Sequence, residues 1–323
     1  MTEKVTSLSE NAQGEAVDPG RGNGFKKVRR WIKKDYGCYL FLLPVIFGFF
    51  VFTAYPVLSS LLYSFTNYNG VFFSKFGAFN FAQLFDPSEF GLFKDVAFSF
   101  GITFLWALIS IPLGMVLSFL VALLVNKEVK GVGVFRLLYY MPTIIPGIAI
   151  SFIWADVFRE AGIANQFLAV LGLPSSQWLE GENTALGTLV LTGVWGIGGN
   201  VIMWLAALRN IGPELYEAAS LDGAGYFTRL FRITIPMSTP MIFYNLINAF
   251  IAAMQAFDVY AMVGRGPNDC LYFISIRIYE TAFGGSNQYG LACAMGWLMF
   301  VVIAILTLIL FKTNKWVNYG EGE

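Results

Sequence analysis

The feature that most constrains this chain is a series of long stretches that contain no charged residue. Seven stretches of 19 or more residues have this property: 36–74, 96–126, 137–155, 161–179, 183–208, 233–257 and 281–311. A helix needs about 20 apolar residues to cross roughly 30 Å of hydrocarbon, and it satisfies its backbone polar groups internally. The pattern therefore predicts an all-α integral membrane protein.

One of the seven stretches is too polar to cross a bilayer. The segment 161–179 holds Asn165, Gln166, Pro174 and Gln177, which would place unpaired polar groups in lipid. We expect it to be a loop outside the membrane, with a short helix through Phe167 to Leu171. The other six stretches predict six transmembrane helices, at Tyr39 to Phe65, Phe98 to Val125, Phe135 to Phe158, Ala185 to Leu208, Pro240 to Val263 and Tyr289 to Phe311.

The composition agrees with lipid as the main solvent of the chain. Hydrophobic residues make up 56% of it and charged residues only 13%, with a formal net charge of zero, so nothing points to a nucleic acid partner. Three cysteines, Cys38, Cys270 and Cys293, form no even disulfide framework and are expected to be small apolar fillers. The absence of histidine removes the commonest metal ligand and general base, and we expect no metal site.

The basic residues predict the orientation of the six spans. With both termini and the second and fourth connections inside, 16 Lys and Arg residues are cytoplasmic and five are external. Seven of the 16 lie between Arg21 and Lys34, directly before the first span. Because cytoplasmic loops carry an excess of Lys and Arg, we expect both termini in the cytoplasm of a bacterial or archaeal cell, with the chain in its cell (inner) membrane.

The same reasoning divides the chain into four parts. Residues 1–35 form a basic cytoplasmic segment that is expected to be partly disordered, and 36–97 hold the first span with an external loop. Residues 98–312 are the transmembrane core, and 313–323 are a cytoplasmic tail. The first apolar run exceeds a signal-peptide core in length, so it is interpreted as a signal anchor.

The fourth connection is a polar segment with an ordered pattern, EAASLDGAGYFTRLFRITIP, which begins at Glu217. Pro213 suits the first position of a helix, which we expect to run to about Leu221. Asp222 is expected to cap a second helix, and Gly223 permits the sharp turn between the two helices. Pro236 is expected to end the second helix. A helical loop that lies on lipid headgroups is the alternative for this segment.

Polar side chains also mark the fifth span. Tyr244, Asn245, Asn248, Gln255 and Asp258 fall on one side of a helix at 100° per residue, which implies a face toward protein or water. Asp258 can alternatively be an interfacial residue in contact with headgroup water. In the fourth span, Gly193, Gly196, Gly198 and Gly199 allow close packing or flexing of the helix.

The polar segment resembles the EAA loop of permease subunits in binding-protein-dependent ABC importers. The resemblance is carried by Glu217-Ala218-Ala219, then Asp222-Gly223-Ala224, then Ile233 and Pro236. Stretches across 135–300 resemble the carbohydrate-uptake, maltose-type branch of these permeases. Where many relatives of that branch carry a Thr-x-Gly-Gly-Pro sequence, this chain has Val263 to Pro267 instead, with Gly264 and Arg265 among its residues.

The resemblance implies a transmembrane subunit of an ATP-driven sugar or oligosaccharide importer that does no covalent chemistry itself. In this family the first helix of the loop is a coupling helix that seats in a cytoplasmic ATPase. It implies a charged contact from Glu217, close contacts from Ala218 and Ala219, the cap at Asp222, the turn at Gly223 and participation of Ala224. The implied partners are an ATPase dimer, a second and paralogous permease, an extracytoplasmic solute-binding protein and membrane lipid.

The sequence agrees with an energy source outside the chain. No G-x-x-x-x-G-K-[ST] motif occurs, so we expect no cofactor bound directly, and ATP and Mg²⁺ to act through the partner ATPase. An intramembrane enzyme is disfavoured because no histidine is present and the acidic residues lie at span ends or in loops. An ion-coupled secondary transporter and an ABC permease for a non-sugar solute stay open as alternatives.

The residues expected to line the translocation pathway are neutral and polar. Amide side chains donate to and accept from sugar hydroxyls, and an aromatic ring can stack on the apolar face of a pyranose. On these grounds the predicted pathway residues are Asn200, Tyr244, Asn245, Asn248 and Gln255.

Overall fold

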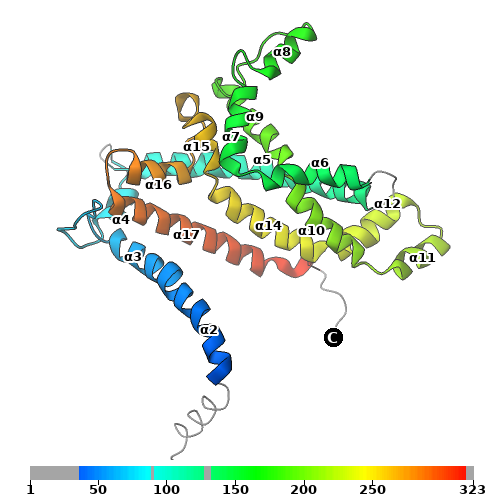
Figure 1. Ribbon diagram of the computed structural model, residues 1–323, viewed down its shortest axis with the longest axis horizontal. Coiled ribbons are helices and arrows are strands. Elements are labelled where there is room, and N and C mark those ends of the chain that lie inside the picture. The colour runs from blue at the N-terminus through cyan, green and yellow to red at the C-terminus, as the bar shows by residue number, and fades with distance from the viewer. Residues whose placement is uncertain (1–35, 89–90, 127–131, 318–323) are drawn as a thin grey trace, which may run out of the picture. The chain divides into compact units, whose positions relative to one another are not determined.

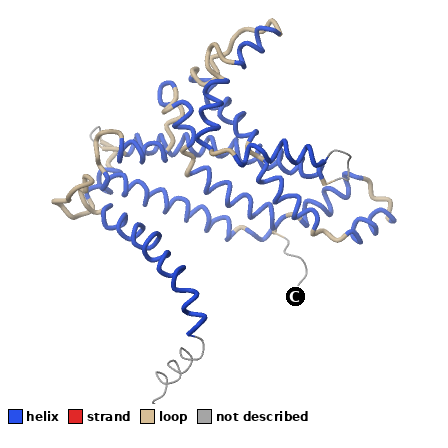
Figure 2. Tube along the Cα trace, viewed as in Figure 1, coloured by secondary structure: helices blue, strands red, loops and turns tan. Residues whose placement is uncertain are grey.

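The computed structural model describes residues 36–88, 91–126 and 132–317. The predicted segment 1–35 and the last part of the predicted tail, 318–323, lie outside the described residues. In the described part every regular element is a helix, and the one β-bridge, between Thr66 and Phe76, is isolated (Figure 2). The chain divides into two units between Ser59 and Ser60.

The described part of the first unit is one apolar helical run. It consists of α2 (Tyr36–Phe49), a π-helical turn η1 (Phe50–Ala54) and the beginning of α3 (Tyr55–Ser64). The π-helical turn lies just before Pro56, which has no N–H to continue the regular hydrogen-bond ladder. Leu40–Ser64 is long and apolar enough to cross a membrane, which confirms the first predicted helix.

In the second unit the longest helix, α5 (Phe93–Val125), packs against several other helices (Figure 1). It contacts α9 (Glu182–Trp195), α10 (Gly198–Arg209), α14 (Thr239–Met254) and α16 (Ile274–Phe283). Both α5 and α17 (Tyr289–Lys312) meet the length and hydropathy that a membrane span requires. The predicted second and sixth helices are therefore present.

The predicted fourth helix is bent. α9 and α10 meet at an angle of 51° across Gly196 and Ile197. Glycine is a poor helix former because it has the most backbone freedom to lose, and a run of glycines at this point accounts for the break. The span predicted over Ala185 to Leu208 is thus present as a bent pair of helices, which is long and apolar enough to count as one span.

The predicted fifth helix begins as expected, at Thr239 of α14 (Thr239–Met254), but ends earlier than expected. Its N-terminal side is the helical run Tyr226–Met237, which is bent by 62° onto α14 at Ser238. α14 ends at Met254, Gln255 is its C-terminal cap, and Asp258 begins a separate helix, α15 (Asp258–Val263). The expected polar face that runs along one helix from Tyr244 to Asp258 is therefore wrong beyond Asn248.

The predicted third helix is divided into two. α6 (Val132–Ile144) and α7 (Gly147–Val157) are separated by Ile145 and Pro146. Pro146 lacks a backbone N–H and disfavours the helical conformation at Ile145. By length and composition alone, the described residues hold three candidate spans, or up to five when each of the two bent pairs is counted as one.

Short elements complete the second unit. They are α4 (Phe79–Phe85), α8 (Ile163–Val170), α11 (Pro213–Leu221), α12 (Tyr226–Arg229), a π-helical turn η2 (Leu230–Thr234), α13 (Ile235–Met237), and the 3₁₀ turns η3 (Pro267–Asp269) and η4 (Asn314–Trp316). α8 confirms that the polar stretch 161–179 carries a short helix, which begins earlier than Phe167.

The buried core gathers where α5 meets its neighbours. Ala122, Val201, Trp204 and Leu208 form a cluster between α5 and α10. A second cluster joins α9 and α15 to the segment that leads into α16, with Leu271 and Phe273 fully buried. Most other large apolar side chains are exposed, as expected for a protein whose surroundings are lipid.

Candidate functional site

The segment singled out by its EAA pattern begins with an exposed helix. α11 runs from Pro213 to Leu221, which are the predicted limits, with Pro213 in its first turn and Glu214 near its positive end. No residue of α11 is buried, and the side chains of Glu217 and Ala218 are exposed. α11 therefore offers a largely open surface within the described chain.

A Schellman turn ends α11. The Ala224 N–H donates to the Ala219 carbonyl at 2.8 Å, and the Gly223 N–H donates to the Ser220 carbonyl at 3.1 Å. Gly223 has a φ of 76°, which glycine adopts without strain. The predicted turn at Gly223 is thus confirmed.

The predicted cap at Asp222 is wrong. Asp222 is the C-terminal cap of α11, whereas the residue that precedes the next helix is Gly225, and no side chain caps it. The Schellman turn accounts for the difference, because it uses Asp222 and Gly223 to close α11 before α12 begins. The second helix ends at Met237, one residue after Pro236, so Pro236 lies in its last turn rather than after its end.

The two helices of this segment are held together by a pair of hydroxyl groups. Tyr216 Oη and Thr234 Oγ1 lie 3.0 Å apart, and Tyr216 packs against the cluster of α5 and α10. α11 is thereby fixed to the helix that leads into α14.

A hollow of about 580 Å³ lies at the turn. The structure brings four of the six predicted coupling residues to its wall, namely Ala219, Asp222, Gly223 and Ala224, while Glu217 and Ala218 lie outside it. The opposite wall carries Arg229 and Arg232. These two arginines were not among the predicted site residues, because the sequence pattern gave them no role.

A second hollow, of about 500 Å³, lies between α5, the break of α9 and α10, and the end of α14. Of the predicted pathway residues, Asn200 and Gln255 line it. Asp258 and Trp106 also line it, and both extend to an adjacent hollow of about 240 Å³ against α7. The cavity therefore forms where two predicted spans, the fourth and the fifth, are broken, rather than along one helical face.

The remaining pathway residues lie elsewhere on α14. The Tyr244 and Asn248 side chains are exposed, and Asn248 Nδ2 donates to the Tyr244 carbonyl at 2.8 Å. Asn245 is buried, and its Nδ2 has no hydrogen-bond partner among the described residues. None of the three lines the cavity that holds Asn200 and Gln255.

Asp258 occupies a tight place between two broken spans. A methyl group at Gly147, the first residue of α7, would overlap its carboxylate. Gly147 is thus the small residue that lets α15 and α7 approach each other. Among the described residues no group of three or more His, Cys, Asp or Glu side chains could hold a metal ion.

The fold and these sites define a class: a helical, multi-pass membrane protein with broken helices around a cavity and an exposed helix–turn–helix segment. The chain belongs to the family of binding-protein-dependent transport system inner membrane components, whose model matches residues 114–318.

Known relatives agree with this assignment. The chain is 36% identical over 312 residues to a probable ABC transporter permease protein, YesP, of Bacillus subtilis, with 94% of this chain and 99% of the relative covered. It is 28% identical to the multiple sugar-binding transport system permease protein MsmF of Streptococcus mutans, with 89% and 98% covered. It is 29% identical to the trehalose/maltose transport system permease protein MalF of Thermococcus litoralis, with 86% and 93% covered.

The fold has a solved counterpart. A chain in the crystal structure of a bacterial ABC transporter involved in the import of alginate superimposes with a TM-score of 0.75, at 22% identity, over 90% of this chain and 99% of that chain. At this identity the likeness concerns the fold.

Proposed function

We propose that the chain is the transmembrane permease subunit of an ATP-driven, binding-protein-dependent importer of sugars or oligosaccharides. The observation that carries the proposal is the position of the two sites at opposite ends of α14. The helix–turn–helix segment leads into its N-terminal end at Ser238, and the cavity with Gln255 lies at its C-terminal end. α14 has 16 residues, so the two sites are separated by about 24 Å of rigid helix.

α11 is the proposed docking helix for a separate ATPase subunit. Its open face with Glu217 and Ala218, and the braced turn at Gly223, suit a surface that inserts into a cleft of a partner. Because Tyr216 is bonded to the helix before α14, a displacement of α11 would be passed to α14 as a rigid body. ATP and Mg²⁺ would act in that partner.

The cavity is the proposed section of the pathway within this subunit. Asn200 and Gln255 provide neutral donors and acceptors for hydroxyl groups, and Tyr244, Asn245 and Asn248 are proposed as pathway residues on α14. Sugar as the cargo is supported by relatives whose names include trehalose and maltose, lactose, and arabinooligosaccharides.

The proposed topology has six spans, with α6 and α7 as the third, and both termini in the cytoplasm. The five external and 16 internal basic residues support this orientation. The four parts proposed for the chain are 1–35, 36–97, 98–312 and 313–323. The further proposed partners are a paralogous permease and an extracytoplasmic solute-binding protein.

Purification of the tagged chain from its own membranes tests the assembly. The proposal expects an ATPase and a second permease to remain bound in detergent. Proteoliposomes that contain this complex and the binding protein should then take up at least one sugar of a panel of maltose, trehalose, lactose and diacetylchitobiose, and uptake should require ATP. Isolation without an ATPase, or uptake driven by an ion gradient alone, would favour a secondary transporter.

A further inference from the structure

A fourth hollow, of about 370 Å³, lies beyond the C-terminal end of α14, in the segment between α15 and α17. Its wall includes Tyr260, Arg265, Tyr272, Glu280, Thr281 and Ser286. The hollow is thus at the same end of α14 as the cavity with Gln255, and at the opposite end from α11. In the proposed topology this end is external.

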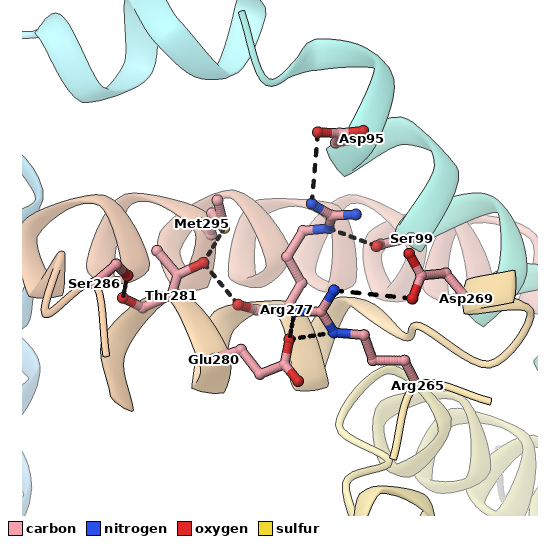
Figure 3. A network of polar contacts seen from close by, with 9 residues as sticks. All are labelled: Asp95, Ser99, Arg265, Asp269, Arg277, Glu280, Thr281, Ser286 and Met295. Carbon is pink, nitrogen blue, oxygen red and sulfur yellow. Dashed lines mark hydrogen bonds and ion pairs between the residues drawn. The ribbon is translucent and has the colours of Figure 1, made fainter. Parts of the chain in front are cut away.

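The charged groups in and beside this hollow are held in place by their neighbours (Figure 3). Glu280 is only 12% exposed, and its Oε2 accepts from Arg265 Nε at 2.7 Å and from Arg265 Nη2 at 2.6 Å. Asp269 lies 3.9 Å from the same guanidinium. Arg277 donates to Ser99 Oγ at 2.7 Å, which fixes α16 to α5. The wall is therefore preformed rather than assembled from loose side chains.

The ring of Tyr272 packs against the guanidinium groups of two arginines. The guanidinium carbons of Arg265 and Arg277 lie 4.4 Å and 4.3 Å from the centre of its ring. Burial and a hydrogen bond to Glu280 raise the pKa of Tyr272 to about 12. Its hydroxyl therefore stays protonated and neutral at physiological pH.

The charges at the wall of the hollow balance, which favours a neutral ligand over a charged one. Arg265 and Glu280 neutralise each other, so neither an anion nor a cation gains from a net charge there. The hydroxyls of Ser286 and Thr281 donate to backbone carbonyls, of Thr281 and Arg277 respectively, and each hydroxyl oxygen keeps the capacity to accept. Fixed polar groups beside aromatic rings suit a neutral, hydroxylated ring.

A row of aromatic rings connects this hollow with the cavity. Phe257 lines the cavity, and its ring stacks on Tyr260, a wall residue of the hollow, with 5.6 Å between centroids and 28° between planes. Tyr279 contacts both rings, at 4.8 Å and 5.6 Å. The row continues outward from Tyr279 through Phe283. A sugar could exchange one aromatic face for the next along this row without full solvation in between.

We propose that this hollow is a second, outer binding site for a neutral sugar, from which the sugar passes along Phe257 and Tyr260 to the cavity with Asn200 and Gln255. The site deepens the proposed importer function and rests on it. It assigns a substrate-binding role to Tyr260, Arg265, Tyr272 and Glu280.

The test fills the hollow while leaving its ion pairs intact. Ser286 is exposed at the wall, so the indole of Ser286→Trp can occupy the hollow without entering the packed core. Gln288→Trp is the matched control, because Gln288 is exposed and does not line the hollow. Tyr260→Leu is a second variant that removes the aromatic surface. Each variant is assembled with its ATPase, second permease and binding protein in proteoliposomes, and uptake of maltose, trehalose, lactose and diacetylchitobiose is measured.

The site predicts that Ser286→Trp and Tyr260→Leu lower kcat/KM for uptake about tenfold or more, which corresponds to about 1.4 kcal/mol. ATP hydrolysis stimulated by the binding protein should remain unchanged, and Gln288→Trp should transport like the original protein. Uptake by Ser286→Trp with unchanged kcat/KM would overturn the outer site, as would a parallel loss of uptake and ATP hydrolysis. If the unaltered complex imports none of the four sugars, the sugar assignment itself fails, and the outer sugar site fails with it.

Discussion

The indole N–H of Trp204 on α10 donates a 3.0 Å hydrogen bond to Ser118 Oγ on α5, and both residues are buried. Their separation of 86 positions in the chain makes this bond a direct link between the second and fourth predicted spans. It lies in the cluster that also holds Tyr216 of α11. The packing around Trp204 thus fixes the helices on which the proposed coupling segment depends.

Removal of this bond should destabilise the protein. Ser118→Ala leaves the indole N–H buried without a partner, and we expect a loss of about 1–3 kcal/mol in the free energy of unfolding. Denaturation of the purified protein in detergent micelles measures it. Ser118→Ala should cost little in a protein that already carries Trp204→Phe, because the indole N–H is then gone. If Ser118→Ala destabilises that variant as much as it destabilises the original protein, the bond contributes nothing.

Gly198 should be intolerant of even one methyl group. A Cβ at this position would overlap the carbonyl oxygen of Tyr139 on α6, so Gly198→Ala must push α6 and α10 apart, at a cost of about 1–3 kcal/mol. Gly199→Ala is the matched control, because no atom lies within 4 Å of its Cβ. Thermal unfolding of the two variants compares them. Equal melting temperatures would show that the close approach of α6 and α10 is not required.

Acid should weaken the Arg265–Glu280 pair. Burial opposes ionisation of Glu280, but hydrogen bonds from Arg265 and Tyr272 outweigh it and place the pKa of Glu280 below its usual 4.5. Because the folded pKa is lowered, the stabilisation is present above pH 4.5 and is lost as the pH falls through the folded pKa. The stability advantage of the original protein over Glu280→Gln should therefore shrink in thermal unfolding below this pH. A difference that stays constant down to about pH 3 would contradict the expectation.

The polar groups of the cavity should matter for transport more than for folding. Gln255→Leu and Asn200→Leu remove neutral hydrogen-bonding groups from its wall, and each should raise KM for sugar uptake about tenfold, the worth of one lost hydrogen bond. Gln83→Leu on α4 is a control with an exposed amide away from the cavity. Unchanged KM in both cavity variants would remove these residues from the pathway.

The sequence predicted the helices that carry a strong, uninterrupted apolar signal. Leu40–Ser64, α5 and α17 were expected nearly as they are, because hydrophobic length alone specifies them. The breaks at Pro146 and between Gly196 and Gly198 could be suspected from residue type. Their position could not, because whether a helix bends at a glycine depends on the helices packed against it, such as α6 against Gly198.

The sites were predicted unevenly for a similar reason. α11 and the turn at Gly223 follow from local signals of proline, glycine and helix ends. The cavity depends on contacts between distant segments. The sequence placed Tyr244, Asn245, Asn248, Gln255 and Asp258 on one helical face, whereas in the structure Gln255 and Asp258 line the cavity with Asn200, and Tyr244, Asn245 and Asn248 do not. No local pattern indicates that Trp106 on α5 faces the same cavity.

α11 is proposed to couple this chain to an ATPase through Glu217. The most direct test is the Glu217→Lys variant in the assembled complex, with sugar uptake and ATP hydrolysis measured side by side. Glu160→Lys is the matched control, because Glu160 is an exposed carboxylate in the loop before α8. If Glu217 makes the contact, Glu217→Lys inserts and folds normally but loses sugar uptake that depends on ATP, whereas Glu160→Lys transports normally. Unchanged sugar uptake by Glu217→Lys would show that Glu217 does not couple this chain to an ATPase.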